Sequence, residues 1–225
     1  KDYLGAESNA TKAIKIFDEL DDNLRLYNSY NLMGVISNGQ KNEDKALEYY
    51  KKAGEYLKTL DNEGLELTNQ NNIAHTLIRK EDYTEALEAY ESLFAVEKLK
   101  EKRPNLYAVA LVSHTYSRFK TGETGEDLNQ KYNEAISIYK TTGQLLDMGR
   151  AQQFLAELLA AQGKREAAIV LAREANQFAE ETQNNDRRLE VLKSLTTMDP
   201  ENAVAYSNAY YDLAEQIKEE ERAKR

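Results

Sequence analysis

The chain lacks several residue types, and each absence narrows what the protein can be. None of its 225 residues is cysteine, which excludes disulfides, thiolate metal sites and cysteine nucleophiles from it. It has no tryptophan and only two prolines, so few positions are barred from a helix interior. The longest apolar runs, such as residues 167–172, fall far short of the roughly 18 residues that indicate a membrane-spanning helix.

An excess of positive charge is also missing. Lys and Arg number 30 against 39 Asp and Glu, which gives a net charge of −9, and the basic residues are interspersed with acids. Nothing in this pattern replaces the counterions of a phosphate backbone, so we expect no nucleic-acid partner. With 31% charged and 41% hydrophobic residues, the composition is typical of a helix-rich folded protein rather than a disordered chain.

What the sequence does contain is a repeat of about 40 residues. The repeat contains a triplet: an alanine-like residue, then an aromatic residue four positions later, then a small residue three positions after the aromatic. This triplet recurs at a nearly constant spacing along the chain. The copies are Ala46-Tyr50-Ala53, Ala86-Tyr90-Leu93 and Leu128-Tyr132-Ala135, with weaker ones at Ala6-Ala10-Ala13 and Ala168-Ala172-Ala175. A fixed period of this size indicates a stack of one supersecondary unit rather than a globule with a single core.

Apolar residues follow the helical period in almost every segment between turn residues. We expect helices near residues 2–18, 21–37, 42–59, 62–79, 82–99, 104–119, 125–141, 145–162, 164–181, 185–197 and 200–223. Pro104 and Pro200 stand at helix starts, where a missing N–H costs nothing, and Asp199 is the expected cap before Pro200. Loops this short require antiparallel neighbours, so the predicted fold class is all-α.

Each unit also has an earlier small residue at the expected helix crossing. In three units it precedes the triplet by twelve positions, at Gly34, Ala74 and Ala156. Ser113 precedes Leu128 by three more, which places an insertion in the loop 121–125. Contacting helix axes lie about 8–10 Å apart, so the crossing needs a small residue beside an aromatic. We expect enlarging Ala53 to cost about 1–3 kcal/mol and Tyr50→Ala about 3–5 kcal/mol.

These residues carry a resemblance to a known family. Tyr30-x-x-Met33-Gly34 followed by Ala46-x-x-x-Tyr50-x-x-Ala53 resembles the tetratricopeptide repeat (TPR), which has a large residue, Leu-Gly, Ala, an aromatic and Ala at these offsets. Asn71-Asn72-Ile73-Ala74 and Glu81-Asp82-Tyr83-x-x-Ala86 are similar to common phrases of the same family. The period is longer than the usual 34, and the fifth unit has alanine in place of the aromatic. HEAT-type repeats share the period but lack this phase.

The resemblance implies a right-handed superhelical stack of antiparallel helix pairs, a TPR solenoid of about 11 helices. A single array would then occupy residues 1–225. Its expected parts are a half repeat at 1–20, repeats at 21–60, 61–100, 101–142 and 143–182, and a degenerate repeat with an exit helix at 183–225.

Residues that could carry chemistry are few. His75 and His114, the two histidines, each follow a crossing position. Adjacent first helices would hold the two rings about 10 Å apart, too far for one metal ion without a third ligand. Ser113 cannot use its neighbour His114 as a base, because consecutive helical side chains diverge. No glycine-rich phosphate loop is present. We therefore expect no catalysis, no metal and no cofactor.

The repeat phase instead predicts a binding surface on the concave side of the first helices. The residues placed there are Asn28, Asn31, Asn71, His75, Arg79, His114, Arg118, Arg150 and Gln153. Asparagine offers a donor and an acceptor to an extended backbone, and arginine forks match carboxylates. This favours an acidic or C-terminal peptide segment as the ligand. The alternative is that helical faces with two polar positions per turn yield such a set without any ligand.

The resulting prediction is a non-catalytic protein- or peptide-binding module. Its charged final helix resembles the exit helix of TPR sensor regions in bacterial signalling proteins, which implies a sensor or scaffold segment, more readily periplasmic than cytoplasmic. Because the chain begins at Lys1, we expect it to be part of a longer protein, with no segment inserted in a membrane here. The alternative is a cytoplasmic peptide-responsive TPR regulator acting on a response regulator. A third is an accessory or phosphatase role exerted through a partner.

One further question concerns oligomeric state. Three tyrosines, Tyr206, Tyr210 and Tyr211, cluster on the last helix, near an open end of the predicted stack. Packing within the chain is the favoured role for them, and a homodimer through the C-terminal helices is the alternative.

Overall fold

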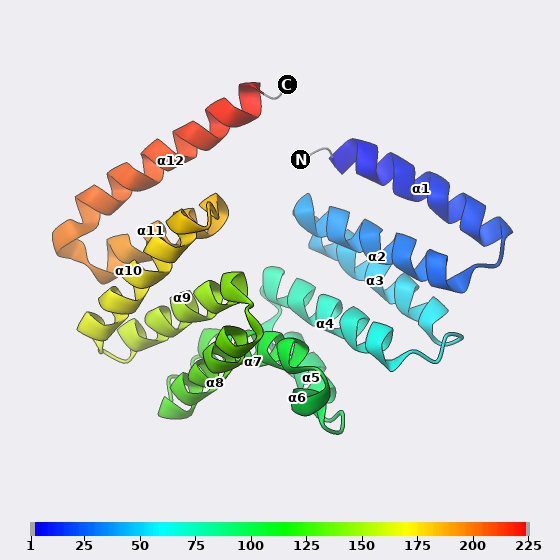
Figure 1. The fold of residues 1–225 in the computed structure, drawn as a ribbon, viewed down its shortest axis with the longest axis horizontal. Helices are drawn as coiled ribbons and strands as arrows, with labels where there is room; N and C mark the ends of the chain where they lie inside the picture. The colour runs from blue at the N-terminus through cyan, green and yellow to red at the C-terminus, as the bar shows by residue number, and fades with distance from the viewer. Residues whose placement is uncertain (1–2, 224–225) are drawn as a thin grey trace. The chain divides into compact units, whose positions relative to one another are not determined.

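A computed structural model describes residues 3–223 of the chain. Within these residues it is all-α, with twelve α-helices, one 3-10 turn and no strand (Figure 1). The first helices are α1 (Tyr3–Glu19), α2 (Asn23–Gly39), α3 (Glu43–Leu57), α4 (Glu63–Arg79), α5 (Tyr83–Phe94) and α6 (Leu99–Lys102). They are followed by α7 (Pro104–Lys120), α8 (Glu126–Thr142), α9 (Leu145–Ala161), α10 (Arg165–Glu181), α11 (Asn185–Met198), η1 (Pro200–Asn202) and α12 (Ala203–Ala223). The predicted all-α class of stacked antiparallel helix pairs is confirmed.

Helix boundaries agree with the sequence prediction to within a few residues, except in the segment predicted as one helix over 82–99. Here α5 ends at Phe94, and the short α6 begins at Leu99. Lys98 between them has φ +60°, a left-handed conformation that cannot continue a right-handed helix.

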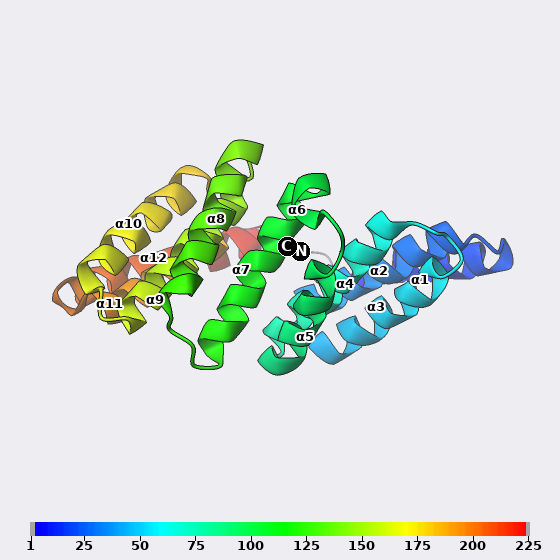
Figure 2. The same cartoon turned by 90° about the horizontal axis from the view of Figure 1, so that it is seen from below.

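The helices fall into two compact units, Lys1–Lys102 with α1–α6 and Arg103–Arg225 with α7–α12. In the first unit, α2 pairs with α3 and α4 with α5, while α1 packs against α2. In the second unit the pairs are α7 with α8, α9 with α10, and α11 with α12 (Figure 2). The prediction of a single array with the repeat boundaries given above stays a prediction.

The core of each unit consists of the repeated triplets. Ala46 and Ala53 are fully buried and Tyr50 is 2% exposed. The copies at Ala86, Leu128 and Ala168 are buried to the same degree, and the weak copy around Ala10 is buried only at its centre. Gly34 shows why the crossing needs a small residue, because a Cβ there would lie 2.5 Å from the Tyr50 ring. The triplet is therefore a packing signal, as its phase predicted.

The predicted insertion is shared between a helix and a loop. Residues 121–125 connect α7 to α8, whereas only residues 40–42 and 80–82 connect the equivalent helices α2 to α3 and α4 to α5. Relative to its crossing residue Ser113, α7 also extends further than α2 does beyond Gly34. The third pair thus has a first helix of the same length that ends later relative to its crossing residue, and an extended turn.

The last helix is fastened by Asp199, although not as the expected side-chain cap of a helix start. Its buried carboxylate receives hydrogen bonds from Tyr206 Oη at 2.9 Å, Arg173 Nη2 at 2.7 Å and Asn202 Nδ2 at 3.1 Å. Tyr206 also packs on the core of this unit. The tyrosine cluster is thereby divided, because Tyr211 is 70% exposed.

Candidate functional site

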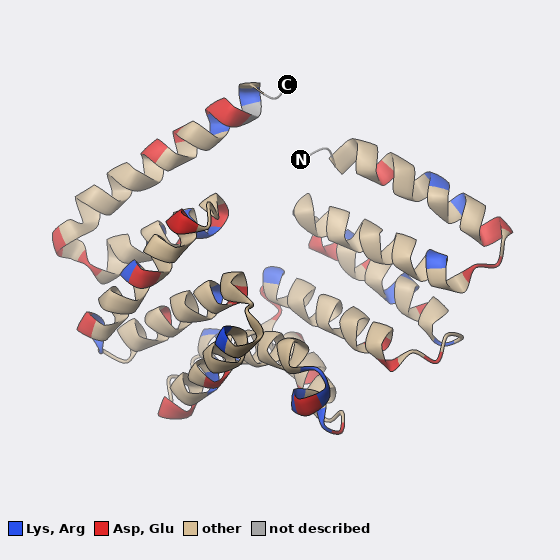
Figure 3. Ribbon diagram, in the orientation of Figure 1, with Lys and Arg blue, Asp and Glu red and all other residues tan. Residues whose placement is uncertain are grey.

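Charged residues are unevenly distributed between the two layers of the first unit. The middle turns of α2 and α4 carry none, whereas α3 and α5 carry several along their lengths (Figure 3). A first-helix surface without charge is suited to neutral contacts rather than to ion pairing.

One face of α2 is exposed and largely aliphatic. Leu24, Leu32 and Val35 are 46%, 46% and 50% exposed, and with the exposed Asn28 they follow the spacing of a single helical face. On α4, His75 occupies the position that Val35 has on α2, counted from the crossing residues. We call this surface the inner face of the first unit. It is formed by Leu24, Asn28, Leu32 and Val35 of α2 and by Thr68, Asn71 and His75 of α4.

One of the amides predicted to face a ligand, Asn31, instead helps to connect α2 to α4. Asn72 Nδ2 donates to Asn31 Oδ1 at 2.9 Å, and Asn38 Nδ2 donates to Thr76 Oγ1 at 2.8 Å. The Oδ1 atom of Asn71 is buried and has no donor within the described residues. Asn31 therefore fixes the spacing of the two helices, and Asn71 contributes an unsatisfied acceptor.

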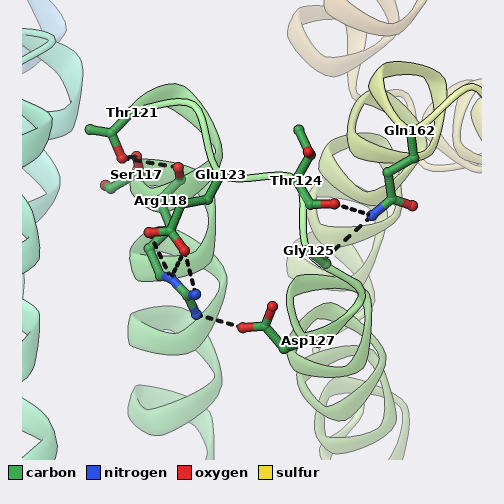
Figure 4. Close-up of polar contacts among 8 residues, drawn as sticks. All are labelled: Ser117, Arg118, Thr121, Glu123, Thr124, Gly125, Asp127 and Gln162. Carbon is green, nitrogen blue, oxygen red and sulfur yellow. Dashed lines mark hydrogen bonds and ion pairs between the residues drawn. The ribbon is translucent and has the colours of Figure 1, made fainter.

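Both predicted ligand-binding arginines at helix ends are held by their own chain. Arg79 Nη2 donates to the Asn38 carbonyl oxygen at 2.9 Å and pairs with Glu43 at 3.3 Å. Arg118 Nε donates to both carboxylate oxygens of Glu123, and its Nη1 donates to Asp127 at 2.9 Å (Figure 4). These guanidinium groups are already bound to acceptors.

The Arg118 contacts form a clasp around the inserted loop. Hydrogen bonding from Arg118 holds the pKa of Glu123 below its ordinary value. On the other side, Gln162 Nε2 donates to the carbonyl oxygens of Thr124 at 3.0 Å and Gly125 at 3.5 Å (Figure 4). The loop is thus fastened both to the end of α7 and to the end of α9.

The two histidines lie in different units and are both partly buried. Burial, with Arg118 and Lys131 as nearby positive charges, lowers the pKa of His114 to about 4, so this imidazole is neutral at ordinary pH. Their predicted separation of about 10 Å stays a prediction. In the described part of the chain no group of three or more His, Asp or Glu residues could hold a metal ion.

In the second unit a polar network joins α9 to α11. Arg187, whose side chain is 12% exposed, donates through Nη1 to Gln153 Oε1 at 2.7 Å and to Glu190 at 2.6 Å. Gln153 and Ser194 both donate to Glu157 Oε1, at 3.2 and 2.9 Å. Burial lowers the pKa of Arg187, and the positive charge of Arg150 lowers it further.

Two residues of α9, Arg150 and Gln153, were predicted to face a ligand. Gln153 is only 4% exposed and takes part in the polar network with α11, whereas Arg150 is the more accessible of the two. Sequence reasoning missed Arg187, because the degenerate last repeat lacks the triplet that would have set its phase. Its Nε atom is buried without an acceptor among the described residues. Which of the predicted residues contact a partner stays a prediction.

None of the helices in residues 3–223 is both long and apolar enough to traverse a bilayer.

The stacked helix pairs and buried triplets are typical of a TPR-like solenoid, and known proteins were compared with the chain on this basis. The tetratricopeptide repeat model matches residues 27–55 and 67–97, so these two segments are similar to tetratricopeptide repeats. No curated protein matches the sequence.

Solved structures share the fold. The crystal structure of the apo form of RapI is similar with a TM-score of 0.78 at 18% identity, covering 96% of this chain and 78% of RapI. BtubC (BKLC) from P. vanneervenii is similar with a TM-score of 0.66 at 15% identity, covering 97% and 93%. At these identities the likeness establishes a TPR-like solenoid fold and nothing further.

Proposed function

We propose that this protein is a non-catalytic module that binds an extended segment of another protein, using the inner face of the first unit. The observation that carries the proposal is the row of aliphatic side chains, Leu24, Leu32 and Val35, each about half exposed on one helix. Exposed apolar groups that share one face are typical of an interaction site.

The chemistry of the face favours a peptide with aliphatic anchors. Aliphatic side chains of the peptide would cover Leu32 and Val35, where removal of apolar surface from water supplies the driving force. Asn28 is exposed beside them and can donate to and accept from a peptide backbone. On α4, the buried Oδ1 atom of Asn71 lacks a donor within the described residues, and a backbone N–H of the peptide would satisfy it.

For the predicted acidic or C-terminal ligand, Arg150 of the second unit is the arginine that we propose binds a carboxylate, independently of the first unit. It is partly exposed, and a guanidinium group matches a carboxylate. The other two arginines predicted for this role are not proposed to bind the ligand, because each is bound to acidic residues of its own chain. Arg79 pairs with Glu43, and Arg118 pairs with Glu123 and Asp127.

In its wider context we infer a sensor or scaffold segment of a larger bacterial signal-transduction protein. The alternative is a cytoplasmic peptide-responsive regulator that acts on a response regulator. RapI, which shares the fold, is described in an apo form. The full-length gene product separates them, because a signal peptide and a membrane helix favour the first and an N-terminal helical bundle favours the second.

Peptide selection tests the binding proposal. Peptides are selected from a displayed random library against the intact chain, and the enriched sequences are titrated by calorimetry against wild type and against Leu32→Asp/Val35→Asp. We expect affinity to fall by about tenfold or more in the double variant. The control is Ile16→Asp, which also replaces an exposed aliphatic residue by aspartate, at a 54% exposed position on α1, and should leave affinity unchanged. Equal affinities for both variants, or no enriched peptide, would refute the proposal.

A further inference from the structure

The outer side of the first unit carries a groove with an apolar floor. Helices α3 and α5 both pack against α4 but leave a strip of its outer side between them. The opening has a volume of about 770 Å³, and Leu47, Ile73, Leu77 and Ala89 form its apolar part. Ile73 and Leu77 lie on the side of α4 opposite His75, because a helix turns by about 100° per residue. We call this opening the outer groove.

The walls of the outer groove are acidic. Glu48 from α3 and Glu85 and Glu88 from α5 line it and are exposed, and no ion pair involves them in the described part of the chain. At one end Lys80 is bound by Asp44 at 3.2 Å and Asp82 at 3.1 Å. Lys51 is then the one lining cation not held by these pairs, so the walls keep an excess of negative charge.

A second groove in the same chain shows that the fold does not require this acidity. In the second unit, α8 and α10 flank α9 around an opening of about 530 Å³ whose floor includes Leu155 and Leu159. Counted from the buried alanines of the two triplets, Ala167 and Val170 occupy the positions of Glu85 and Glu88. The acidic walls therefore belong to the first unit's residues and not to the helix arrangement.

We propose that the outer groove docks a lysine- or arginine-rich amphipathic helix of another protein. An apolar stripe at i, i+3 and i+4 spacing would cover the floor, and flanking cations would face Glu48, Glu85 and Glu88, whose negative charge exceeds that of the lining cation Lys51. The wall helix α5 has 12 residues and is about 18 Å long, which suits about three turns of partner helix. Because α4 separates this groove from the inner face, both surfaces can be occupied at once.

A designed peptide probes the groove directly. The probe is a fluorescein-labelled helical peptide of about 16 residues with leucines on one face and lysines flanking them, and its control is a scrambled peptide of identical composition without an apolar face. Binding to the intact chain is followed by fluorescence anisotropy. We expect the amphipathic peptide to bind about tenfold more tightly than the scrambled one, and its affinity to fall as salt is raised.

Matched variants locate the binding. Glu48→Gln/Glu85→Gln/Glu88→Gln should weaken binding about tenfold. The control Glu166→Gln/Glu201→Gln/Glu215→Gln changes the net charge equally at exposed positions of the second unit and should have little effect. Because the chain has no cysteine, Ser92→Cys, at the groove lining, can carry a single fluorophore that a quencher-bearing peptide darkens, whereas Ser137→Cys in the second unit should not respond.

Three results would overturn the proposal: equal binding of the scrambled peptide, unchanged binding by the groove triple variant, or no binding of the amphipathic peptide at all. A second copy of this chain could also occupy the outer groove, and sedimentation of the free chain tests this. Self-association abolished by the groove triple variant and retained by the control would show that the groove serves a homo-oligomer, against the proposal. Helical content and melting temperature of every variant should match wild type, so that loss of binding is not loss of fold.

Discussion

Gly34 and Tyr50 form a matched pair at the crossing of α2 and α3. The ring lies where a Cβ on residue 34 would stand, 2.5 Å away, and the ring is itself 2% exposed. Neither partner can change size without displacing the other, since the interior is close-packed. At the scale of single residues, the repeated small and aromatic positions therefore determine stability rather than binding.

Enlarging this crossing should be costly. We expect Gly34→Ala to lower the free energy of unfolding by about 1–3 kcal/mol, because the added methyl group overpacks the interface. Urea denaturation followed by circular dichroism measures the change. The exposed Asn28→Ala serves as the control and should stay within about 0.5 kcal/mol of wild type. If both variants unfolded alike, the crossing would not be tightly packed.

Substitution of a turn residue that has a positive φ should instead stabilise the chain. Glu81 has φ +65° where the equivalent turn after α9 has Gly163 at +78°. Glycine adopts this conformation without the steric strain that a residue with a Cβ incurs, so Glu81→Gly should stabilise the chain by about 0.5–1 kcal/mol after the entropy of glycine is counted. Gly163→Glu, measured in the same denaturation series, should be destabilising. Destabilisation by Glu81→Gly would contradict this.

At the scale of helices, the sequence predicted what depends on periodic packing and missed what depends on a single folded geometry. The triplets around Tyr50 and Tyr90 predicted the helix pairs and their core. The break after Phe94 carries no Gly or Pro signal, and it became visible only through the left-handed Lys98. The polar face of α4 was predicted, but the engagement of Arg118 was not, because it requires the inserted loop to fold back onto α7.

The clasp on the inserted loop should respond to acid. Since hydrogen bonding from Arg118 depresses the pKa of Glu123 in the folded state, its contribution is present above the ordinary value of 4.5 and is lost as pH falls through the folded-state pKa. Hydrogen exchange of residues 121–125 should therefore accelerate, relative to other loops, on acidification. Arg118→Met should produce the same acceleration at neutral pH. A loop that exchanged identically in both proteins would not be held by Arg118.

The attachment of α12 has its own pH dependence. Burial acts to raise the pKa of Asp199, but hydrogen bonds from Tyr206, Asn202 and Arg173 outweigh it and hold the pKa below its ordinary value of 3.8. The attachment is thus complete above that value and weakens as pH falls through the folded-state pKa. Asp199→Asn should loosen α12 at neutral pH, seen as faster proteolysis within residues 203–223. Unchanged cleavage would contradict this role.

At the scale of the whole molecule, the repeats support surfaces of different chemistry on one framework. The inner face presents aliphatic and amide groups, and the outer groove presents an apolar floor between acidic walls. A homodimer through the C-terminal helices stays a proposal, for which the 70% exposure of Tyr211 is the available support. Sequence periodicity predicted a polar binding surface on the first helices of the pairs, but it did not predict the exposed aliphatic side chains there, because Leu24, Leu32 and Val35 fit the pattern of core residues equally well.

Calorimetric titration of a selected peptide into wild type, Leu32→Asp/Val35→Asp and Ile16→Asp tests the central claim most directly, because it measures whether the inner face of the first unit binds an extended segment. The account predicts that wild type and Ile16→Asp bind alike, while the double variant binds about tenfold more weakly or not at all. Equal binding by all three proteins would contradict it.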